Sequence, residues 1–217
     1  RNPFAPIADW DMMYTTDPEQ AINYVSAHDN LALWDKINIW ANANGHGGNE
    51  AYKRRLQQYA NGIVLTSQGI PFIHGGEEFA RTKHEIHDSY IAPDSVNAFD
   101  WNFKTNAQEI VDYYASFIEL RKAHPGFRMN TWDEVDQNVD TWVDQSGAVM
   151  NYIRAANNGD SWSEILVIYH SGSNFEYTPA GTGWKIAASG SAPAAGGTPV
   201  NGSVTVEGSA VTVLYKD

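Results

Sequence analysis

Cysteine is absent from the 217 residues of the chain. Its absence excludes a disulfide framework and thiolate metal sites, but it leaves the redox compartment open. Positive charge is also scarce, because 14 Lys and Arg stand against 26 Asp and Glu, for a formal net charge of −12. Such a chain repels phosphate backbones and anionic lipid, so nucleic acid and membrane surfaces are not expected partners. A neutral or cationic ligand fits this charge better.

Long apolar runs are missing too. No stretch of the sequence is long and apolar enough to span a bilayer, and no signal peptide is visible. The chain begins "RNPFAP" without a methionine, which is typical of a processed or excised piece of a longer protein. Aromatic residues, by contrast, make up 12% of the chain, with eight Trp and eleven Tyr. Their flat faces and polar edges suit sugar rings, although most are expected in the core.

The first half of the chain predicts short strands that alternate with helices. Residues 49–68 have the apolar spacing of a helix, with Asn49 as N-cap and Gly69 and Pro71 beyond the end. The segment "GIPFIHGGEEF" follows as a short apolar run closed by a Gly pair, which predicts a buried strand and a turn. Upstream, "AINYVSAHDN" predicts another short strand, which ends in a polar cluster.

A second helix is predicted downstream, in "TNAQEIVDYYASFIELRKAHPG". Thr105 and Gln108 have the spacing of a capping box, and Pro125 with Gly126 provides a stop. The order strand, helix, strand, helix predicts an α/β unit. Two strands cannot close a barrel or cover both faces of a parallel sheet, so the first 126 residues are predicted to be the end of a larger domain.

After Gly126 the pattern changes to β-rich segments separated by Gly, Ser, Asn and Pro turns. These segments are "AVMNYIRA", "EILVIYH", "SVTVEG" and "AVTVLY". They predict a separate, all-β antiparallel sandwich over residues 127–217, whose alternating strands offer one buried face to a neighbouring domain. The small, turn-rich stretch "AASGSAPAAGGTPVNG" is predicted to be a loop within it, because more strands follow.

Polar side chains stand where the first predicted strand ends. In α/β barrels the loops after the strands build the active site, which makes His28 and Asp29 a candidate catalytic cluster. The alternative is that Asp29 caps the turn and His28 is a hydrogen-bonded core histidine. The local pattern alone leaves both interpretations open.

The second predicted strand ends at Glu77 and Glu78. Paired acids could be a general acid and base, but acids at the start of a short helix also favour its N-terminal dipole, and this structural interpretation is preferred. His74, His84 and His87 lie near one another without HExxH or another compact ligand spacing, so a zinc site is not expected. GxSxG, Walker A and GxGxxG patterns are absent.

Three ordered motifs together resemble a known family. "INYVSAHDN" with "LALWDKI", then "NGIVLTSQGIPFIHGGEEFARTK", then "DSYIAPDSVNAFDW" closely resemble the C-terminal part of pullulanase-type debranching enzymes of the α-amylase superfamily. The resemblance is strong over residues 7–128, and the β-rich region fits the family's small C-terminal domain by position more than by motif. It implies that residues 1–126 are the C-terminal part of a (β/α)8 TIM barrel and that residues 127–217 are a C-terminal β-sandwich domain.

The resemblance also implies an activity and a site. The family hydrolyses α-1,6-glucosidic branch linkages in pullulan, starch and related α-glucans with retention, through an Asp nucleophile, a Glu acid/base and a third carboxylate. Retention needs the first two about 5 to 5.5 Å apart. By this resemblance Asp29 is the third, catalytic carboxylate, and His28 contacts a sugar hydroxyl beside it. Asp94 and Asn97 match positions that bind glucose units on the non-reducing side of the cleaved bond, with Tyr90 as a further substrate contact.

Neighbouring residues have simpler alternatives. Asp94 follows Pro93 and has the chemistry of a turn residue. Trp101 is expected to be a core anchor more than a stacking platform. Trp34, one helical turn beyond the polar cluster, fits either role.

The chain also departs from the family pattern. No segment resembles the earlier strands that carry the nucleophile and the acid/base, and the contexts of Asp9, Asp11 and Asp17 do not match the nucleophile motif. One carboxylate of three cannot run a retaining mechanism. The expected partners are therefore an α-glucan polysaccharide and the remaining N-terminal part of the same enzyme, as a separate chain or a missing segment.

Two other hypotheses for the function stay open. One is an α-1,4-acting amylase, an isoamylase or a glycogen debrancher, because HDN is shared across the superfamily, although "APDSVNAFDW" favours pullulanase. The other is a noncatalytic carbohydrate-binding module. The reaction requires no cofactor, and calcium is common in the superfamily, but no EF-hand spacing places a site. An enzyme of large glucans is expected to be secreted or displayed at the cell surface.

Overall fold

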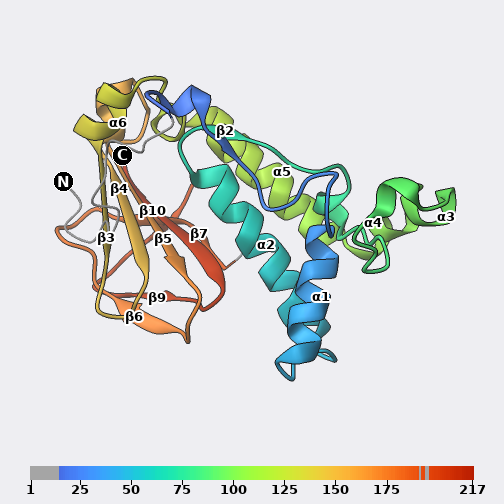
Figure 1. Cartoon of the computed structure of the whole chain (residues 1–217). Helices are drawn as coiled ribbons and strands as arrows, with labels where there is room; N and C mark the ends of the chain where they lie inside the picture. Colours follow the sequence, from blue (N-terminus) through green and yellow to red (C-terminus); the bar gives the residue numbers. More distant parts are fainter. Residues whose placement is uncertain (1–14, 191, 194–195) are drawn as a thin grey trace.

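The computed structural model describes residues 15–190, 192–193 and 196–217, so Asp9 and Asp11 lie outside the described residues. Helices of the first half pack beside an antiparallel sheet of the second half (Figure 1). The elements of the first part are η2 (Pro18–Gln20), β1 (Ile22–Asn23), α1 (Leu33–Ala43), α2 (Glu50–Thr66), β2 (Ile70–Pro71), η3 (Glu77–Phe79), η4 (Ser89–Ile91), α3 (Asp94–Asn97), α4 (Asn102–Asn106), α5 (Gln108–Ala123) and η5 (Pro125–Phe127). The strands and helices predicted for an α/β unit are thus both present in the first part.

The two strands of the first part are short and pair in parallel, with Ile22 opposite Ile70. The prediction that they are buried is wrong, because Ile22 is 60% exposed and Ile70 45% exposed. Tyr24 and Phe72 continue the same alternation and are also exposed, with their rings in edge contact at 5.9 Å. Burial of a parallel strand requires elements on both faces, and no described element covers this face of the pair.

The predicted helix at residues 49–68 is confirmed as α2, whose N-cap Asn49 accepts a hydrogen bond from the Tyr52 amide through its side chain at 3.1 Å. The capping box proposed for α5 is wrong. Thr105 lies inside the separate helix α4, and Ala107 is the N-cap residue of α5. Asp100 starts α4 early, because its Oδ1 accepts from the Asn102 amide at 2.9 Å.

Gly62 explains how α2 comes so close to its neighbours. A glycine inside a helix costs about 1 kcal/mol relative to alanine. A Cβ at Gly62 would lie 2.4 Å from the Tyr113 hydroxyl and 2.8 Å from Val211 Cγ2. Only a residue without a side chain lets α2 lie this close to both α5 and the sheet.

The second part forms two antiparallel sheets within the described residues. Its elements are α6 (Trp132–Asn138), β3 (Val139–Val143), β4 (Val149–Ile153), η6 (Ala155–Asn158), β5 (Glu164–His170), β6 (Phe175–Tyr177), β7 (Lys185–Ser189), β8 (Thr198–Pro199), β9 (Val204–Val206) and β10 (Ala210–Lys216). One sheet has the order β3-β4-β5-β10-β7-β8 and the other pairs β6 with β9. Each of the four predicted β segments is therefore confirmed as a strand. The predicted loop "AASGSAPAAGGTPVNG" is not entirely a loop, because it contains the C-terminal end of β7 and all of β8.

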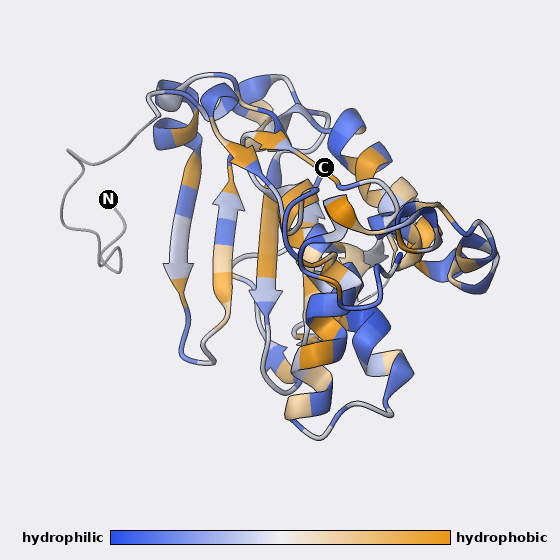
Figure 2. Ribbon diagram, turned by 45° about the vertical axis from the view of Figure 1, so that its right-hand side comes forward, coloured by the Kyte–Doolittle hydropathy of each residue, from blue (hydrophilic) through white to orange (hydrophobic). Residues whose placement is uncertain are grey.

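The central strands are buried on both faces, where one buried face was predicted. Along β5, Ile165 and Val167 belong to the core shared with the helices, whereas Leu166 and Ile168 face the core with β9. Figure 2 shows hydrophobic residues concentrated along the central strands and in the helices beside them. The prediction failed because helices α2 and α5 cover one face while the small β6–β9 sheet covers the other.

One buried cluster joins the two parts. It includes Phe117 of α5 and Val213 of β10, both 0% exposed. His124 adds a polar joint, since its Nδ1 lies 2.7 Å from Asp160 Oδ1 and its ring stacks on Trp162 at 3.5 Å. The expected domain boundary after residue 126 stays a prediction, and η5 lies across it.

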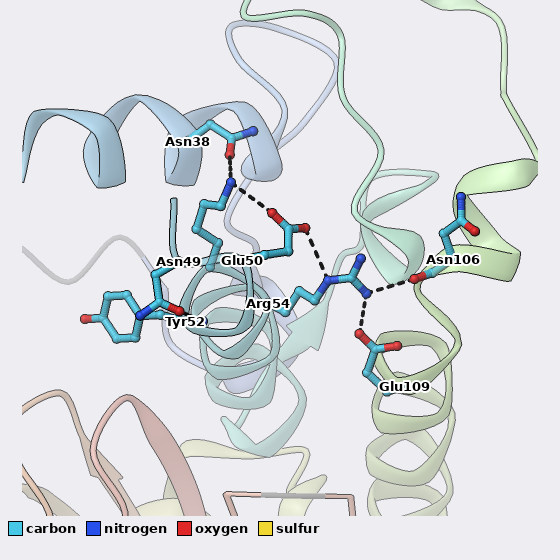
Figure 3. A network of polar contacts seen from close by, with 8 residues as sticks. Asn38, Asn49, Glu50, Tyr52, Arg54, Asn106 and Glu109 are labelled. Carbon is cyan, nitrogen blue, oxygen red and sulfur yellow. Dashed lines mark hydrogen bonds and ion pairs between the residues drawn. The ribbon is translucent and has the colours of Figure 1, made fainter. Parts of the chain in front are cut away.

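Polar contacts tie the helices of the first part together (Figure 3). Arg54 of α2 pairs with Glu50, with Glu109 of α5 and with the Asn106 carbonyl, the last at 2.9 Å. Lys53 pairs with Glu50 at 3.0 Å. Burial acts to raise the pKa of Glu50, but the bonds and charges of Lys53 and Arg54 outweigh it, so the pKa lies below its usual value. No helix in the described ranges is both long and apolar enough to cross a membrane.

Candidate functional site

The candidate catalytic cluster lies in the loop between β1 and α1. The side chains of His28 and Asp29 are 83% and 75% exposed, and His28 Nε2 lies 3.6 Å from Asp29 Oδ1. Asn30 follows with a φ of 62°, a left-handed conformation that asparagine tolerates better than most residues. The structure thus rejects a core position for His28. It presents both side chains to solvent at the end of a strand.

Two contacts anchor the start of this loop. Lys36 of α1 donates from Nζ to the Val25 carbonyl at 2.9 Å. The Ser26 hydroxyl donates to Glu77 Oε1, and both residues are buried. Since Glu77 follows β2, this bond links the loops that leave the ends of the two parallel strands.

Glu77 and Glu78 open the short helix η3, so the predicted position of this pair at the start of a helix is confirmed. Glu77 differs from its neighbour because it is only 3% exposed. Burial raises the pKa of Glu77 to about 7, although the hydrogen bond from Ser26 acts in the opposite direction. This carboxyl is therefore neutral far more often at neutral pH than an exposed glutamate would be.

His74 lies in the loop after β2, and the positive charges of Lys83, Arg81 and Lys36 act on it. Burial is the largest cause that lowers its pKa, and the charges of Lys83 and Arg81 lower it further, with smaller contributions from His28 and Lys36. The imidazole is therefore mostly neutral at neutral pH. Within the described part of the chain, no group of three or more His, Cys, Asp or Glu side chains is placed to hold a metal ion.

The other predicted substrate contacts share one loop after β2. Tyr90 is 78% exposed in η4, and Asp94 is exposed at the start of α3. Asn97 ends α3 and is half-buried, and its Nδ2 donates to the carbonyls of Ser89 at 2.6 Å and Ala92 at 3.0 Å. Both amide hydrogens of Asn97 are thus used inside the loop, which leaves its Oδ1 for a ligand.

Buried polar residues hold this loop in place. Asp35 of α1 is 0% exposed and accepts from the Lys83 amide at 2.8 Å, as well as from the Thr82 hydroxyl at 2.5 Å. Lys83 in turn donates from Nζ to Ser89 Oγ at 2.9 Å. Arg81 donates to the Asn97 carbonyl and lies over the Phe99 ring, 4.1 Å from its centroid. No hydrogen bond or ion pair of the described residues joins this loop to His28 or Asp29.

The two tryptophans near the motifs have different environments. Trp101 is 64% exposed and stacks on Phe99 at 5.5 Å, so the expectation of a core anchor is wrong. The reason is that α4 projects away from the main core, as Figure 1 shows. Trp34 is half-buried against the core, with Lys53 Nζ 5.5 Å from its ring centroid, which favours packing over a stacking platform.

Sequence patterns missed the residues that support the site. Ser26 stands in a motif quoted for its His and Asp, and Asp35 and Lys83 lie in motifs quoted only for their resemblance. A polar residue at an apolar position of a strand end, such as Ser26, is the one local signal that could have indicated a buried hydrogen bond. Asp35 and Thr82 lie 47 positions apart, and no local pattern reveals such a pair.

No family model matches the chain. Among curated proteins, pullulanase of Bacillus subtilis (strain 168) is 36% identical over 155 residues, which is 71% of this chain and 21% of that protein. Isoamylase of Pseudomonas amyloderamosa is 26% identical over 209 residues, or 77% of this chain and 27% of that protein. The chain thus spans between a fifth and about a quarter of the length of these relatives.

Solved structures agree with the sequence relatives. Pullulanase type I from Bacillus subtilis str. 168 complexed with maltose has a TM-score of 0.86 and 31% identity, covering 95% of this chain and 29% of that one. Pullulanase from Anoxybacillus sp. LM18-11 complexed with maltotetraose has a TM-score of 0.83 and 35% identity, covering 94% of this chain and 29% of that one. These likenesses confirm the resemblance that the three ordered motifs carry.

Proposed function

Because the chain is a pullulanase-type C-terminal segment in sequence and fold, we propose that it works as part of a glycoside hydrolase that cleaves α-1,6-glucosidic branch linkages with retention. In this proposal the substrate is pullulan, starch or a related α-glucan. The observation that carries it is the placement of Asp29 and His28, exposed in the loop that follows a parallel strand. That is where barrel enzymes hold their catalytic groups.

The first part of the chain has the features of a barrel segment. β1 and β2 are parallel neighbours joined through α1 and α2, as successive barrel strands are. Ile22, Tyr24, Ile70 and Phe72 are exposed apolar side chains along the strand pair. A groove of about 510 Å³ lies beside β2, lined by Ile70, Pro71 and Ile118 among others. In the proposed barrel, further strands would cover the exposed side chains and occupy the free edge of β2.

The proposed chemistry assigns one role to Asp29. A fixed carboxylate beside a glycosidic bond stabilises the positive charge that develops at the sugar ring, and it acts more strongly on the transition state than on the neutral substrate. His28 beside it would contact a sugar hydroxyl. The nucleophile and the acid/base would come from the remaining part of the enzyme, since a retaining reaction needs two carboxyl groups on opposite faces of the bond.

The loop with Tyr90 and Asp94 would bind neighbouring glucose units. An exposed aromatic ring and an exposed carboxylate offer a sugar both an apolar face and a hydrogen-bond acceptor. Asn97 would act partly by holding this loop, because both of its amide hydrogens already bind carbonyls within it. The pullulanase structures with maltose and maltotetraose support a glucan as the ligand class.

The proposed hydrolysis uses carboxyl side chains and water, and it needs no cofactor. Calcium is a candidate structural ion, which would not take part in the reaction. An enzyme of polysaccharides would work outside the cell or at its surface, where the substrate is.

A spliced enzyme tests the proposal. Residues 15–217 replace the matching part of Bacillus subtilis pullulanase, and the release of reducing ends from pullulan is measured. We expect hydrolysis well above background, and an Asp29→Asn variant with a turnover lower by about a hundredfold or more at nearly unchanged KM. The matched control is Asp136→Asn, which changes an exposed aspartate of α6 far from the strand ends. A soluble spliced enzyme that binds pullulan without cleaving it would favour a noncatalytic binding module.

The isoamylase likeness favours a second candidate specificity. Isoamylase-like action would give faster hydrolysis of glycogen than of pullulan by the same spliced enzyme, and an α-1,4-acting amylase would cleave linear amylose. Comparing the three substrates under one set of conditions separates these specificities.

A further inference from the structure

We propose that Glu77 is a positioning residue for Asp29, acting through its buried hydrogen bond from Ser26. The inference rests on the proposed function for its catalytic consequence, but its structural claim concerns only this chain. Glu77 does not touch the predicted site. It fixes the loop three residues before Asp29.

The acceptor side of this bond is rigidly built. η3 is bounded by Gly76 at φ 98° and Ala80 at φ 55°, both left-handed. A Cβ at Gly76 would lie 2.5 Å from Arg81 Cδ, so the turn before Glu77 requires glycine. The Glu77 carbonyl accepts from Gln57 Nε2 of α2 at 2.8 Å, and Gln57 is 0% exposed. The backbone of Glu77 is therefore held from helix α2, while its carboxyl is held by Ser26 in the loop after β1.

The donor side of the bond lies at the last anchor of the loop. Ser26 is 1% exposed. Beyond it, no hydrogen bond described in the structure ties residues 27–31 to another segment, and the contact between His28 and Asp29 joins only those two. The direction in which Asp29 leaves the strand is thus set at Ser26, because each unanchored residue adds two soft dihedrals.

The burial of Ser26 and Glu77 favours a stable hydrogen bond between them. A buried hydroxyl that loses its hydrogen-bond partner destabilises the folded state, because it has already given up its bonds to water. Burial raises the pKa of Glu77, and in its neutral form the carboxyl still accepts from Ser26 with its carbonyl oxygen. The charged and titratable groups near it are Lys36 of α1, Tyr114 of α5, and Glu78 and His74 beside η3. The loop therefore stays anchored in either protonation state, and a neutral amide at this position should serve equally well.

Order parameters of the 217-residue chain test the structural claim. Backbone 15N relaxation is measured for residues 27–30 in the original chain and in Ser26→Ala, Glu77→Gln and Glu78→Gln. We expect order parameters near 0.85 in the original chain, below about 0.6 in Ser26→Ala, and near 0.85 again in Glu77→Gln, whose amide oxygen keeps the acceptor. Glu78→Gln is the matched control, since Glu78 accepts from the Gly76 amide and not from Ser26.

Kinetics of the spliced enzyme test the catalytic consequence. Ser26→Ala should lower kcat about ten- to hundredfold with KM changed less than about twofold, because a misplaced catalytic group costs rate more than binding. Glu77→Gln should stay within about threefold of the original rate. Unchanged order in Ser26→Ala, or an unchanged kcat despite disorder, would overturn the inference. If the spliced enzyme hydrolyses no glucan at all, the proposed function fails, while the order parameters still decide the structural claim.

Discussion

The strands of the two parts of this chain differ in how completely they are covered. β1 and β2 have two residues each, and both isoleucines that face each other across the pair are largely exposed. β5 and β10 have seven residues each, and six of the seven are buried in both. The apolar character of the sequence is similar in both places, so the difference comes from what lies beside the strands.

The comparison shows that the central strands of the β-rich part are paired at both edges and covered on both faces. β10 pairs in antiparallel with both β5 and β7, and two layers cover the central strands. A parallel pair needs helices on one face and further strands at its edges and on its other face. Over residues 15–126, which the structure describes, the first part has only the helices, and its exposed apolar residues indicate where the rest of a barrel would pack.

The largest expected effect comes from matched truncations in the two parts. Ile165→Ala in β5 should lower the free energy of unfolding by about 2 to 5 kcal/mol, because the side chain is fully buried and leaves a cavity. Ile22→Ala in β1 should change it by less than about 0.5 kcal/mol in this chain. Urea unfolding monitored by circular dichroism measures both. Equal effects would mean that β1 is covered in solution.

The joint between the two parts gives the next effect. Asp160→Asn should lower the free energy of unfolding by about 3 kcal/mol at neutral pH, since Asp160 accepts from His124 and from two backbone amides in a buried position. Burial acts to raise the pKa of Asp160, but these bonds outweigh it and the pKa lies below the usual 3.8. A depressed pKa means that the stabilisation is complete above about 3.8 and is lost as the pH falls through the folded-state pKa.

The difference between Asp160→Asn and the original chain should therefore shrink on acidification, because asparagine does not titrate. Unfolding titrations at pH 7, 4 and 3 check this prediction. A difference that stays constant over this range would show that the carboxylate charge contributes nothing at the joint. Asp140→Asn is a suitable control, as its ion pair with Arg154 is exposed.

The smallest effect compares two adjacent arginines of α2. Arg54 lies in the network of Figure 3 within the first part, whereas Arg55 makes a single ion pair at 3.5 Å with Glu207 of the second part. Arg54→Ala should cost about 1 kcal/mol and Arg55→Ala close to nothing, because an isolated exposed pair is screened by water. Thermal unfolding in low and high salt measures both changes. A larger loss for Arg55→Ala would mean that the two parts depend on surface charge.

Several elements were predictable from the sequence because their causes are local. Asn49 caps α2 from a position next to the helix, and the β segments after residue 126 carry their own alternation and turns. The place of His28 and Asp29 between the first strand and the next helix was predictable for the same reason, although β1 already ends at Asn23 and the cluster lies in the loop that follows. The capping box at Thr105 failed because a separate helix, α4, already includes Thr105, and Asp100 accepts from the Asn102 amide at its start.

The support of the site was not predictable. Ser26 and Glu77 lie 51 positions apart, and Asp35 and Lys83 lie 48 apart. Their hydrogen bonds exist only because β1 and β2 pair in parallel and bring two distant loops to the same edge. Asn97 was predicted as a sugar contact, and the structure adds that its amide holds the loop together.

The sequence by itself determined the local elements, the negative charge, the polar cluster after the first strand and the resemblance to a family. These depend on neighbours along the chain, on counts, or on ordered motifs. Only the tertiary structure decided which strands are covered, which carboxyl is buried at a raised pKa, and how α2 and α5 meet the sheet at Gly62. The reason is physical, because burial and hydrogen bonding are properties of surroundings that the fold assembles from distant residues.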